Sequence, residues 1–188
     1  MGVHRGCIEL SASQSAHQRH ERREETLAYG DFARGDHAEL SVREVADRLA
    51  IRELVDAYAF CADRREAARQ MALFTEDTDF LVYMDRESPS PTRHLRGRVA
   101  LKPVFEELNT YEATMHFNGQ SSAMLDGERA SGVTYCMAHH VKFDGSARRL
   151  MIAAIRYLDT FVKHNGAWFF SQRKLMVDWT ETRPLVTG

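Results

Sequence analysis

Two polar residues interrupt the strand-like segment TMHFNGQ at residues 114–120. His116 and Asn118 are two positions apart, and because side chains alternate along a strand, both point to the same face. The neutral imidazole of histidine, with a pKa near ~6.5, accepts a proton at neutral pH and can return it later. His116 is therefore a candidate acid/base group if that face lines a pocket; otherwise it is a solvated or core histidine.

A carboxylate would complete this chemistry, and the family resemblance given below implies Asp63, in the string CADRRE, for that role. Bonded to one ring nitrogen, it would fix the tautomer of His116 and stabilise the imidazolium that forms. Such a pair suits removal of a carbon-bound proton beside a leaving group or a carbonyl. Tyr58 could donate a hydrogen bond to the oxygen that gains charge. This chemistry requires no metal and no organic cofactor.

Less specific roles are open for the same residues. Asp63-Arg64-Arg65-Glu66 has the pattern of a capping box, in which Asp63 would only cap a second helix. Tyr58 lies on the apolar stripe of its predicted helix, which is typical of core packing. The two residues are also ~140° apart around an ideal helix, so they converge only if the helix ends before Asp63.

Three helices are predicted in the first half of the chain. The first begins at the capping box Ser41-Val42-Arg43-Glu44, after which apolar residues recur at helical spacing as far as Cys61. The second is expected from Arg64 to Phe74. The third follows Gly97 through VALKPVFEELNTY, where a proline is tolerated only near the first turn. A short strand pair, TDFLVYMD and TRHLRG, lies between the second and third helices.

Four long strands are predicted in the second half. Three dipeptides favour tight turns because Gly, Asn and Asp accept a positive φ, namely Asp126-Gly127, Asp144-Gly145 and Asn165-Gly166. The segments that they separate are residues 113–125, 128–143, 148–163 and 167–179. The pattern predicts an antiparallel meander, and helices followed by a long sheet indicate an α+β fold.

Composition limits the location and the partners of the protein. Residues 1–40 are polar and are expected to form a mobile tail, followed by one domain over residues 41–182 and a short tail at 183–188. A formal net charge of −2 gives no basic face for nucleic acid, and no apolar run approaches the ~20 residues that span a bilayer. The three widely spaced cysteines favour neither a disulfide framework nor a metal site. These features predict a cytoplasmic protein.

The order of the elements and three strings resemble the SnoaL-like branch of the nuclear transport factor 2-like superfamily. The strings are DRLAIRELVDAYAFCADRREAARQMALFTEDTDF, MHFNGQ and RYLDTFVKHNGAWFF, and the resemblance covers residues 43–182. It implies a cone-shaped fold, in which three N-terminal helices pack in a strongly curved, mainly antiparallel sheet and leave an apolar pocket.

The resemblance also implies roles for particular residues. Scytalone dehydratase, a bile-acid 7α-dehydratase and hexachlorocyclohexane dehydrochlorinase share an Asp at the end of the first helix and a His on a central strand. Asp63 and His116 stand at these positions. Tyr58 matches a tyrosine of the bile-acid enzyme, and His140 matches a second histidine of scytalone dehydratase.

The chain departs from scytalone dehydratase at the positions that hold its substrate. Ala62 replaces a tyrosine, and Ile155 and Tyr157 replace a serine and an asparagine. We therefore expect this chain to share the chemistry of scytalone dehydratase but to act on a different substrate. The residues expected to contact the substrate here are Tyr83, Asn118 and Tyr157.

His139 and His140 are adjacent on a predicted strand and so point to opposite faces. The pattern of apolar residues places His139 on the more apolar face, whereas the family match selects His140, and a bulge would exchange them. We take His140 as the pocket residue. Opposite-facing neighbours make a poor two-ligand metal site. Arg156 and Arg173 are expected to pair with acids in the sheet rather than with a substrate.

The resemblance implies a cofactor-independent, dehydratase-like lyase or isomerase that acts on a small hydrophobic cyclic or polyketide-like molecule. It also implies a homodimer or homotrimer formed through the sheet. The same fold serves as a non-catalytic ligand-binding or partner module, such as the β subunit of aromatic-ring dioxygenases, and this alternative stays open. The sequence names neither the substrate nor the choice among elimination, isomerisation and cyclisation.

Overall fold

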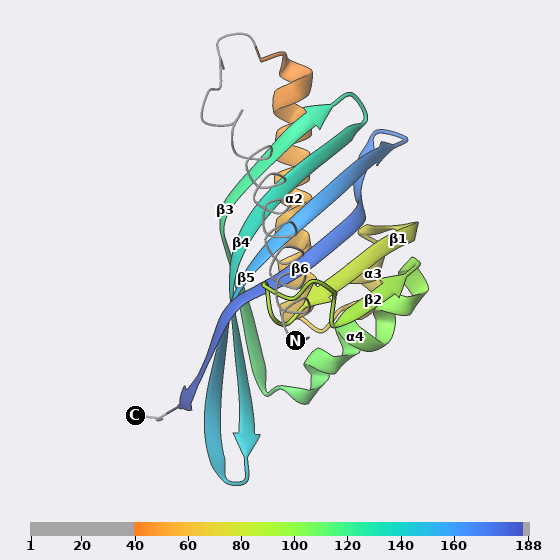
Figure 1. Cartoon of the computed structure of the whole chain (residues 1–188). Coiled ribbons are helices and arrows are strands. Elements are labelled where there is room, and N and C mark those ends of the chain that lie inside the picture. The colour runs from red at the N-terminus through yellow and green to blue at the C-terminus, as the bar shows by residue number, and fades with distance from the viewer. Residues whose placement is uncertain (1–39, 186–188) are drawn as a thin grey trace, which may run out of the picture.

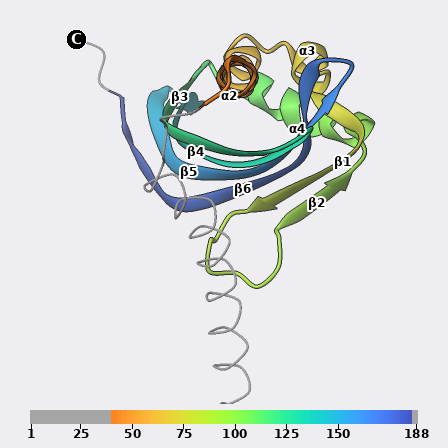
Figure 2. The ribbon, with the colours of Figure 1, turned by 90° about the horizontal axis from the view of Figure 1, so that it is seen from above.

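A long helix lies in the concave face of a curved sheet, and shorter helices close one end of the resulting cone (Figures 1 and 2). A computed structural model describes residues 40–185 of the chain. The tail predicted for residues 1–40 lies outside these residues, apart from its last position. The α+β class and the cone-shaped arrangement predicted from the sequence are confirmed.

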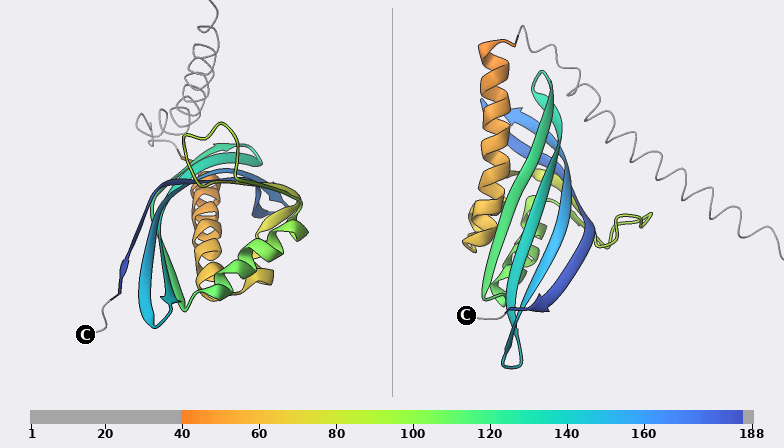
Figure 3. Two further views of the ribbon diagram at one scale, coloured as in Figure 1. Left: turned by 60° about the horizontal axis from the view of Figure 1, so that its bottom comes forward. Right: turned by 90° about the vertical axis from the view of Figure 1, so that its left-hand side faces the viewer.

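The long helix α2, Val42–Asp63, begins at the predicted capping box. Glu44 N donates to Ser41 Oγ at 3.2 Å, and Ser41 N donates to Glu44 Oε2 at 2.9 Å. Farther along, Asp47 accepts hydrogen bonds from Lys163 Nζ and Trp168 Nε1, at 2.6 and 2.9 Å. These contacts fasten the helix to β5 and β6. Figure 3 shows the helix lying across the concave face of the sheet.

The region after α2 differs from the prediction. The helix runs to Asp63 itself, and the short helix α3, Ala67–Met71, has Glu66 as its N-cap, with no side-chain cap hydrogen bond. The capping box that residues 63–66 could have formed, the alternative role of Asp63, is therefore absent, because the Asp63 carboxylate binds a neighbouring strand instead. The third predicted helix is broken into η2 Arg98–Leu101, α4 Lys102–Glu106 and η3 Glu107–Thr110.

Six strands form one sheet in the order β2-β1-β6-β5-β4-β3. Their bounds are β1 Phe74–Tyr83, β2 Arg93–Arg96, β3 Ala113–Asp126, β4 Arg129–Asp144, β5 Ala147–His164 and β6 Ala167–Pro184. The meander of β3 to β6 and the β1–β2 pair agree with the prediction, and β6 extends beyond its predicted end. All neighbours are antiparallel except β1 and β6, which pair in parallel.

The three hairpin turns use their glycines as expected. Gly127 and Gly145 have φ values of 60° and 62°, while the aspartates before them still belong to the strands. Only the third turn places both predicted residues in the left-handed region, Asn165 at 51° and Gly166 at 83°. The glycine is thus the residue that all three turns require.

A buried ion pair crosses the core between β5 and β6. Arg173 donates to both carboxylate oxygens of Asp159 at 2.8 Å, and both side chains are 0% exposed. The guanidinium carbon also lies 4.1 Å from the ring centroids of Tyr58, Tyr157 and Phe170. The expectation that Arg173 pairs within the sheet is confirmed, and Arg156 likewise pairs with an acid of β6, Asp178.

Removal of one partner of this buried pair is expected to destabilise the protein strongly. Asp159→Leu leaves Arg173 charged in the core without its carboxylate, which should lower the free energy of unfolding by about 3–5 kcal/mol. The double variant Asp159→Leu/Arg173→Met removes the stranded charge and should recover most of this loss. Urea unfolding measures both, and equal losses in the single and double variants would contradict the expectation.

Candidate active site

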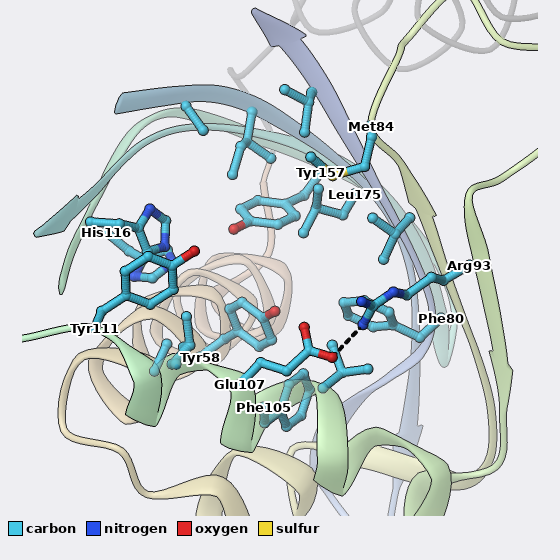
Figure 4. Close-up of a pocket in the computed structure, with 18 of the residues that line it drawn as sticks. Tyr58, Phe80, Met84, Arg93, Phe105, Glu107, Tyr111, His116, Tyr157 and Leu175 are labelled. Carbon is cyan, nitrogen blue, oxygen red and sulfur yellow. Dashed lines mark hydrogen bonds and ion pairs between the residues drawn. The ribbon is translucent and has the colours of Figure 1, made fainter. Parts of the chain in front are cut away.

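A cavity of about 530 Å³ opens between the concave face of the sheet and the helices, beside the C-terminal end of α2 (Figure 4). Much of its lining is apolar, including Phe80, Val82, Phe105, Ile155, Leu175 and Val177. The polar side chains in the lining are Tyr58, Gln70, Thr92, Arg93, Glu107, Thr110, Tyr111, His116, His140 and Tyr157. The cavity therefore suits a molecule with an apolar body and a few polar groups.

Asp63 and His116 meet where the end of α2 touches β3. The His116 ring nitrogen Nδ1 lies 2.7 Å from Asp63 Oδ1, and the backbone N–H of His116 donates to Asp63 Oδ2 at 2.9 Å. The hydroxyl of Thr114 donates to Asp63 Oδ1 at 3.0 Å. Three hydrogen bonds from one strand thus hold the carboxylate of the last residue of α2.

The charge state of Asp63 follows from these contacts. Burial alone raises the pKa of this carboxyl group, but the hydrogen bonds and charge of His116 and the hydrogen bond of Thr114 outweigh burial, so its pKa lies below the usual value. An ionised carboxylate only accepts hydrogen bonds, so Nδ1 of His116 carries the proton. In the neutral ring Nε2 is then unprotonated, and His116 is one of the residues that line the cavity.

His140 lines the same cavity and is 7% exposed. Its ring lies 5.4 Å from that of His116, nearly perpendicular to it, and 4.7 Å from the ring of Tyr111. Burial and the neighbouring His116 lower the pKa of His140 to about 4, so the ring is neutral at pH 7. Its Nδ1 is buried and has no hydrogen-bond partner among residues 40–185.

The structure places His140, not His139, at the cavity. Residues of β4 with even numbers face the core, as the burial of Thr134, Cys136 and Ala138 shows, and the β4–β5 ladder has no register shift. The apolar pattern favoured His139 wrongly, because the convex face of the sheet carries apolar residues too. The position selected by the family match is the one that lines the cavity.

Tyr58 and Tyr157 lie on the inner wall of the cavity, with ring centroids 5.8 Å apart. Figure 4 shows their hydroxyl groups directed into the space between the walls. Burial raises the pKa of Tyr58 to about 12, although Arg173 opposes this, and burial also raises that of Tyr157. Both phenols therefore stay protonated and can donate hydrogen bonds. Because α2 continues to Asp63, Tyr58 approaches the cavity separately from the Asp63–His116 pair.

Two expected substrate-binding residues are not among those that line the cavity. Asn118 shares the face of His116, as expected, but α2 covers it there. Its amide donates to Val55 O at 3.3 Å and to Asp56 Oδ1 at 3.1 Å. Tyr83 is 7% exposed and lies outside the lining. Neither residue has a geometric basis for contact with a molecule in this cavity.

Sequence reasoning missed several polar residues of the site. Thr114 stands two positions before His116, so the same strand alternation could have found it. Gln70, 1% exposed, belongs to the lining. Arg93 and Glu107 pair at 2.6 Å in the lining, and both are about half exposed. No local pattern links Arg93 to Glu107, because they belong to different elements.

Among residues 40–185, no group of three or more His, Cys, Asp or Glu side chains could hold a metal ion. In the same range, no helix is long and apolar enough to cross a membrane.

The chain is similar in sequence to proteins of two mycobacteria. Uncharacterized proteins of Mycobacterium tuberculosis and Mycobacterium bovis are 28% identical to this chain over 143 residues, which is 73% of this chain and 90% of theirs.

Several solved structures are similar to this chain. A protein of Novosphingobium aromaticivorans assigned as a scytalone dehydratase has a TM-score of 0.60 and 25% identity over 70% of this chain and 84% of that one. A hexachlorocyclohexane dehydrochlorinase of Novosphingobium barchaimii has a TM-score of 0.61 and 16% identity over 75% of this chain and 91% of that one. A protein of N. aromaticivorans assigned as the β subunit of an aromatic-ring-hydroxylating dioxygenase has a TM-score of 0.61 and 22% identity. The match covers 74% of this chain and 93% of that one. The last two likenesses concern the fold alone.

The family follows from the sequence match and the architecture together. A family model for the SnoaL-like domain matches residues 43–174, which span all the helices and strands described here up to the first part of β6. The curved sheet around a long helix and the similar solved structures agree with this match. The chain belongs to the SnoaL-like domain family of the nuclear transport factor 2-like superfamily.

Proposed function

We propose that this protein is a dehydratase-like lyase or isomerase that uses Asp63 and His116 as an acid/base pair and needs no cofactor. The observation that carries the proposal is the 2.7 Å contact of His116 Nδ1 with Asp63 Oδ1 at the wall of a largely apolar cavity. It meets the geometric requirement for a general base with an orienting carboxylate. The similarity to a protein assigned as a scytalone dehydratase supports the same class of reaction.

The proposed reaction begins with transfer of a carbon-bound proton to Nε2 of His116. The electron pair of the C–H bond forms the new double bond, and the leaving group departs with its own electron pair. If the leaving group is hydroxide, the imidazolium returns the proton to it and water is formed. Ionised Asp63 stabilises the imidazolium between these two transfers. If the double bond forms toward a carbonyl instead, the electron pair of the C=O double bond moves to its oxygen. The imidazolium then returns the proton to another carbon of the resulting enolate, which gives isomerisation.

The remaining polar groups would hold oxygen atoms of the substrate. The phenols of Tyr58 and Tyr157 are protonated donors directed into the cavity, and they suit an oxygen that gains negative charge. Neutral His140 lies near His116 and lines the same cavity, where its ring would contact a hydroxyl group of the substrate. The apolar walls favour a small hydrophobic cyclic or polyketide-like body.

A substrate screen tests the proposal and includes the alternative as an outcome. The purified chain is incubated with cyclic and polyketide-like ketones that carry a β-hydroxyl or halogen substituent. Mass spectrometry detects the loss of water or of hydrogen halide, and the incorporation of deuterium from D₂O. If such compounds raise the melting temperature but none is converted, a non-catalytic ligand-binding or partner module is favoured.

His116→Ala is expected to reduce turnover of a converted compound by ~10²–10⁴-fold, because the general base is removed. Stability should fall by only about 1–2 kcal/mol, since Thr114 and the backbone N–H still bind Asp63. The matched control is His94→Ala. His94 Nε2 lies 2.7 Å from Asp79 Oδ1, a similar pair that is not in the cavity lining. Equal turnover in the two variants would rule out His116 as the base.

Asp63→Asn is expected to reduce turnover by ~10²–10⁴-fold while preserving the shape of the side chain. An uncharged amide no longer stabilises the imidazolium, and it does not hold the ring of His116 in one tautomer. Asp56→Asn is the control, because Asp56 also joins α2 to β3, through Asn118, but outside the cavity lining. Steady-state kinetics on both variants measure the difference, and an active Asp63→Asn variant would contradict the mechanism.

Neutral buried His140 should make stability depend on pH. Its pKa is about 4 in the folded protein against 6.5 for an ordinary histidine, so the unfolded chain binds the proton more readily. The stability that this difference provides is complete above pH ~6.5, and up to about 3 kcal/mol is lost as the pH falls toward the folded pKa. Urea unfolding at several pH values should show a shallower decline for His140→Gln than for the parent. If the free energy of unfolding declines equally in the two proteins as the pH falls, His140 is not the group responsible.

A further inference from the structure

The end of α2 carries a strained residue of an unusual type. Glu66 N donates to Cys61 O at 2.9 Å, and Arg65 N donates to Ala62 O at 3.2 Å, which is the Schellman pattern of a helix end. Arg65 has a φ of 62°, in the left-handed position where glycine is usual because a Cβ is crowded there. Among residues 40–185, the one other non-glycine with positive φ is Asn165, a residue type that tolerates it in a turn.

The side chain of Arg65 folds back over the end of the helix. Its Nη1 donates to Ala62 O at 3.0 Å, to Asp63 O at 3.3 Å and to Thr114 Oγ1 at 2.5 Å. Its Nη2 donates to Tyr111 O at 3.5 Å. One guanidinium therefore joins the last turn of α2 to the start of β3 and to the segment before it. A cation is also favourable at the C-terminal end of a helix.

These contacts set the direction of the Thr114 hydroxyl group. A guanidinium only donates hydrogen bonds, so Thr114 Oγ1 must accept from Arg65. The single hydroxyl hydrogen is then left for the other neighbour, Asp63 Oδ1, at 3.0 Å. Asp63 Oδ1 also accepts from Nδ1 of His116. A continuous chain of hydrogen bonds thus leads from Arg65 through Thr114 and Asp63 to the imidazole.

We infer that Arg65 is a positioning residue of the Asp63–His116 pair, which acts through Thr114 to hold the carboxylate and, with it, the Nδ1-protonated tautomer of His116. The inference rests on the proposed function for its catalytic meaning, whereas the hydrogen-bond chain itself does not depend on any substrate. Arg65 is not in the cavity lining, so it has no direct contact with a molecule bound there.

A simple helix cap does not account for this residue. Glycine at position 65 would end the helix without backbone strain. Strained residues cluster at functional sites, where the surrounding structure maintains them. The preceding Arg64 offers a comparison, since its side chain is largely exposed, pairs with Glu66 and lies over the ring of Phe60. After burial and His116, the charge of Arg65 also contributes to the low pKa of His140.

The test is an NMR spectrum of the histidine rings in the full-length protein, with Arg65→Gly and Thr114→Val compared with Arg64→Gly and Thr114→Ser. The parent should show a protected Nδ1 proton of His116, bonded to a carboxylate. We expect this signal to be lost or shifted in Arg65→Gly and Thr114→Val, although both variants melt within a few degrees of the parent. Arg64→Gly and Thr114→Ser should retain it, the latter because the hydroxyl group is kept.

Turnover supplies a second readout where a substrate is converted. Arg65→Gly and Thr114→Val should lose at least ~10-fold in kcat, and the two controls should not. An unchanged His116 signal in Arg65→Gly and Thr114→Val would overturn the inference and leave the proposed function intact. If Arg65→Gly fails to fold, the comparison of Thr114→Val with Thr114→Ser decides. A parent that shows the signal but converts no compound refutes the proposed function and leaves the positioning role intact.

Discussion

The site depends on one junction, where the C-terminal end of α2 is bound to the start of β3 through the carboxylate of Asp63. Apolar packing is not directional, so polar contacts fix where the helix lies on the curved sheet, and Asp47 and Asn118 supply further ones along α2. Hydrogen bonds from Thr114, the His116 backbone and the His116 ring fix one register of helix against strand. The hydrogen bonds that join α2 to β3 therefore also orient the imidazole of His116. The Asp63 carboxylate thus serves both the fold and the proposed chemistry.

The interior is divided between a filled core and an open cavity. Phe74 and Phe170 stack at 4.9 Å, with Tyr58 edge-on to both, and Arg173 with Asp159 lies beneath these rings. This cluster fills the space between the sheet and the middle of α2. The cavity opens beside the C-terminal end of the helix, where Tyr58 of this cluster and Phe105 of α4 form part of its wall. The rigid aromatic cluster thus supports the phenols of Tyr58 and Tyr157, which face the cavity.

Sequence patterns anticipated the elements whose signals are local. The turn glycines and the alternation of β3 predicted the meander and the shared face of His116 and Asn118, and the family resemblance added Asp63. Long-range contacts were not foreseen, such as the parallel pairing of β1 with β6 and the cover that α2 places over Asn118. The capping pattern left two roles open for Asp63, because a helix N-terminus and a strand both offer backbone donors, and only the folded chain decides between them. His139 was misplaced by pattern since apolar residues also occupy the convex face.

Two histidine–aspartate pairs in this fold show why distance alone does not define a base. His94 lies 2.7 Å from Asp79, as His116 lies from Asp63. Yet the side chain of His94 is 32% exposed, so water can reach its ring and compete for any proton. That of His116 is 8% exposed and belongs to the cavity wall. In such a low-dielectric site the carboxylate stabilises an imidazolium far more than it does in water. The cavity, rather than the pair, separates the candidate catalytic histidine from an ordinary surface ion pair.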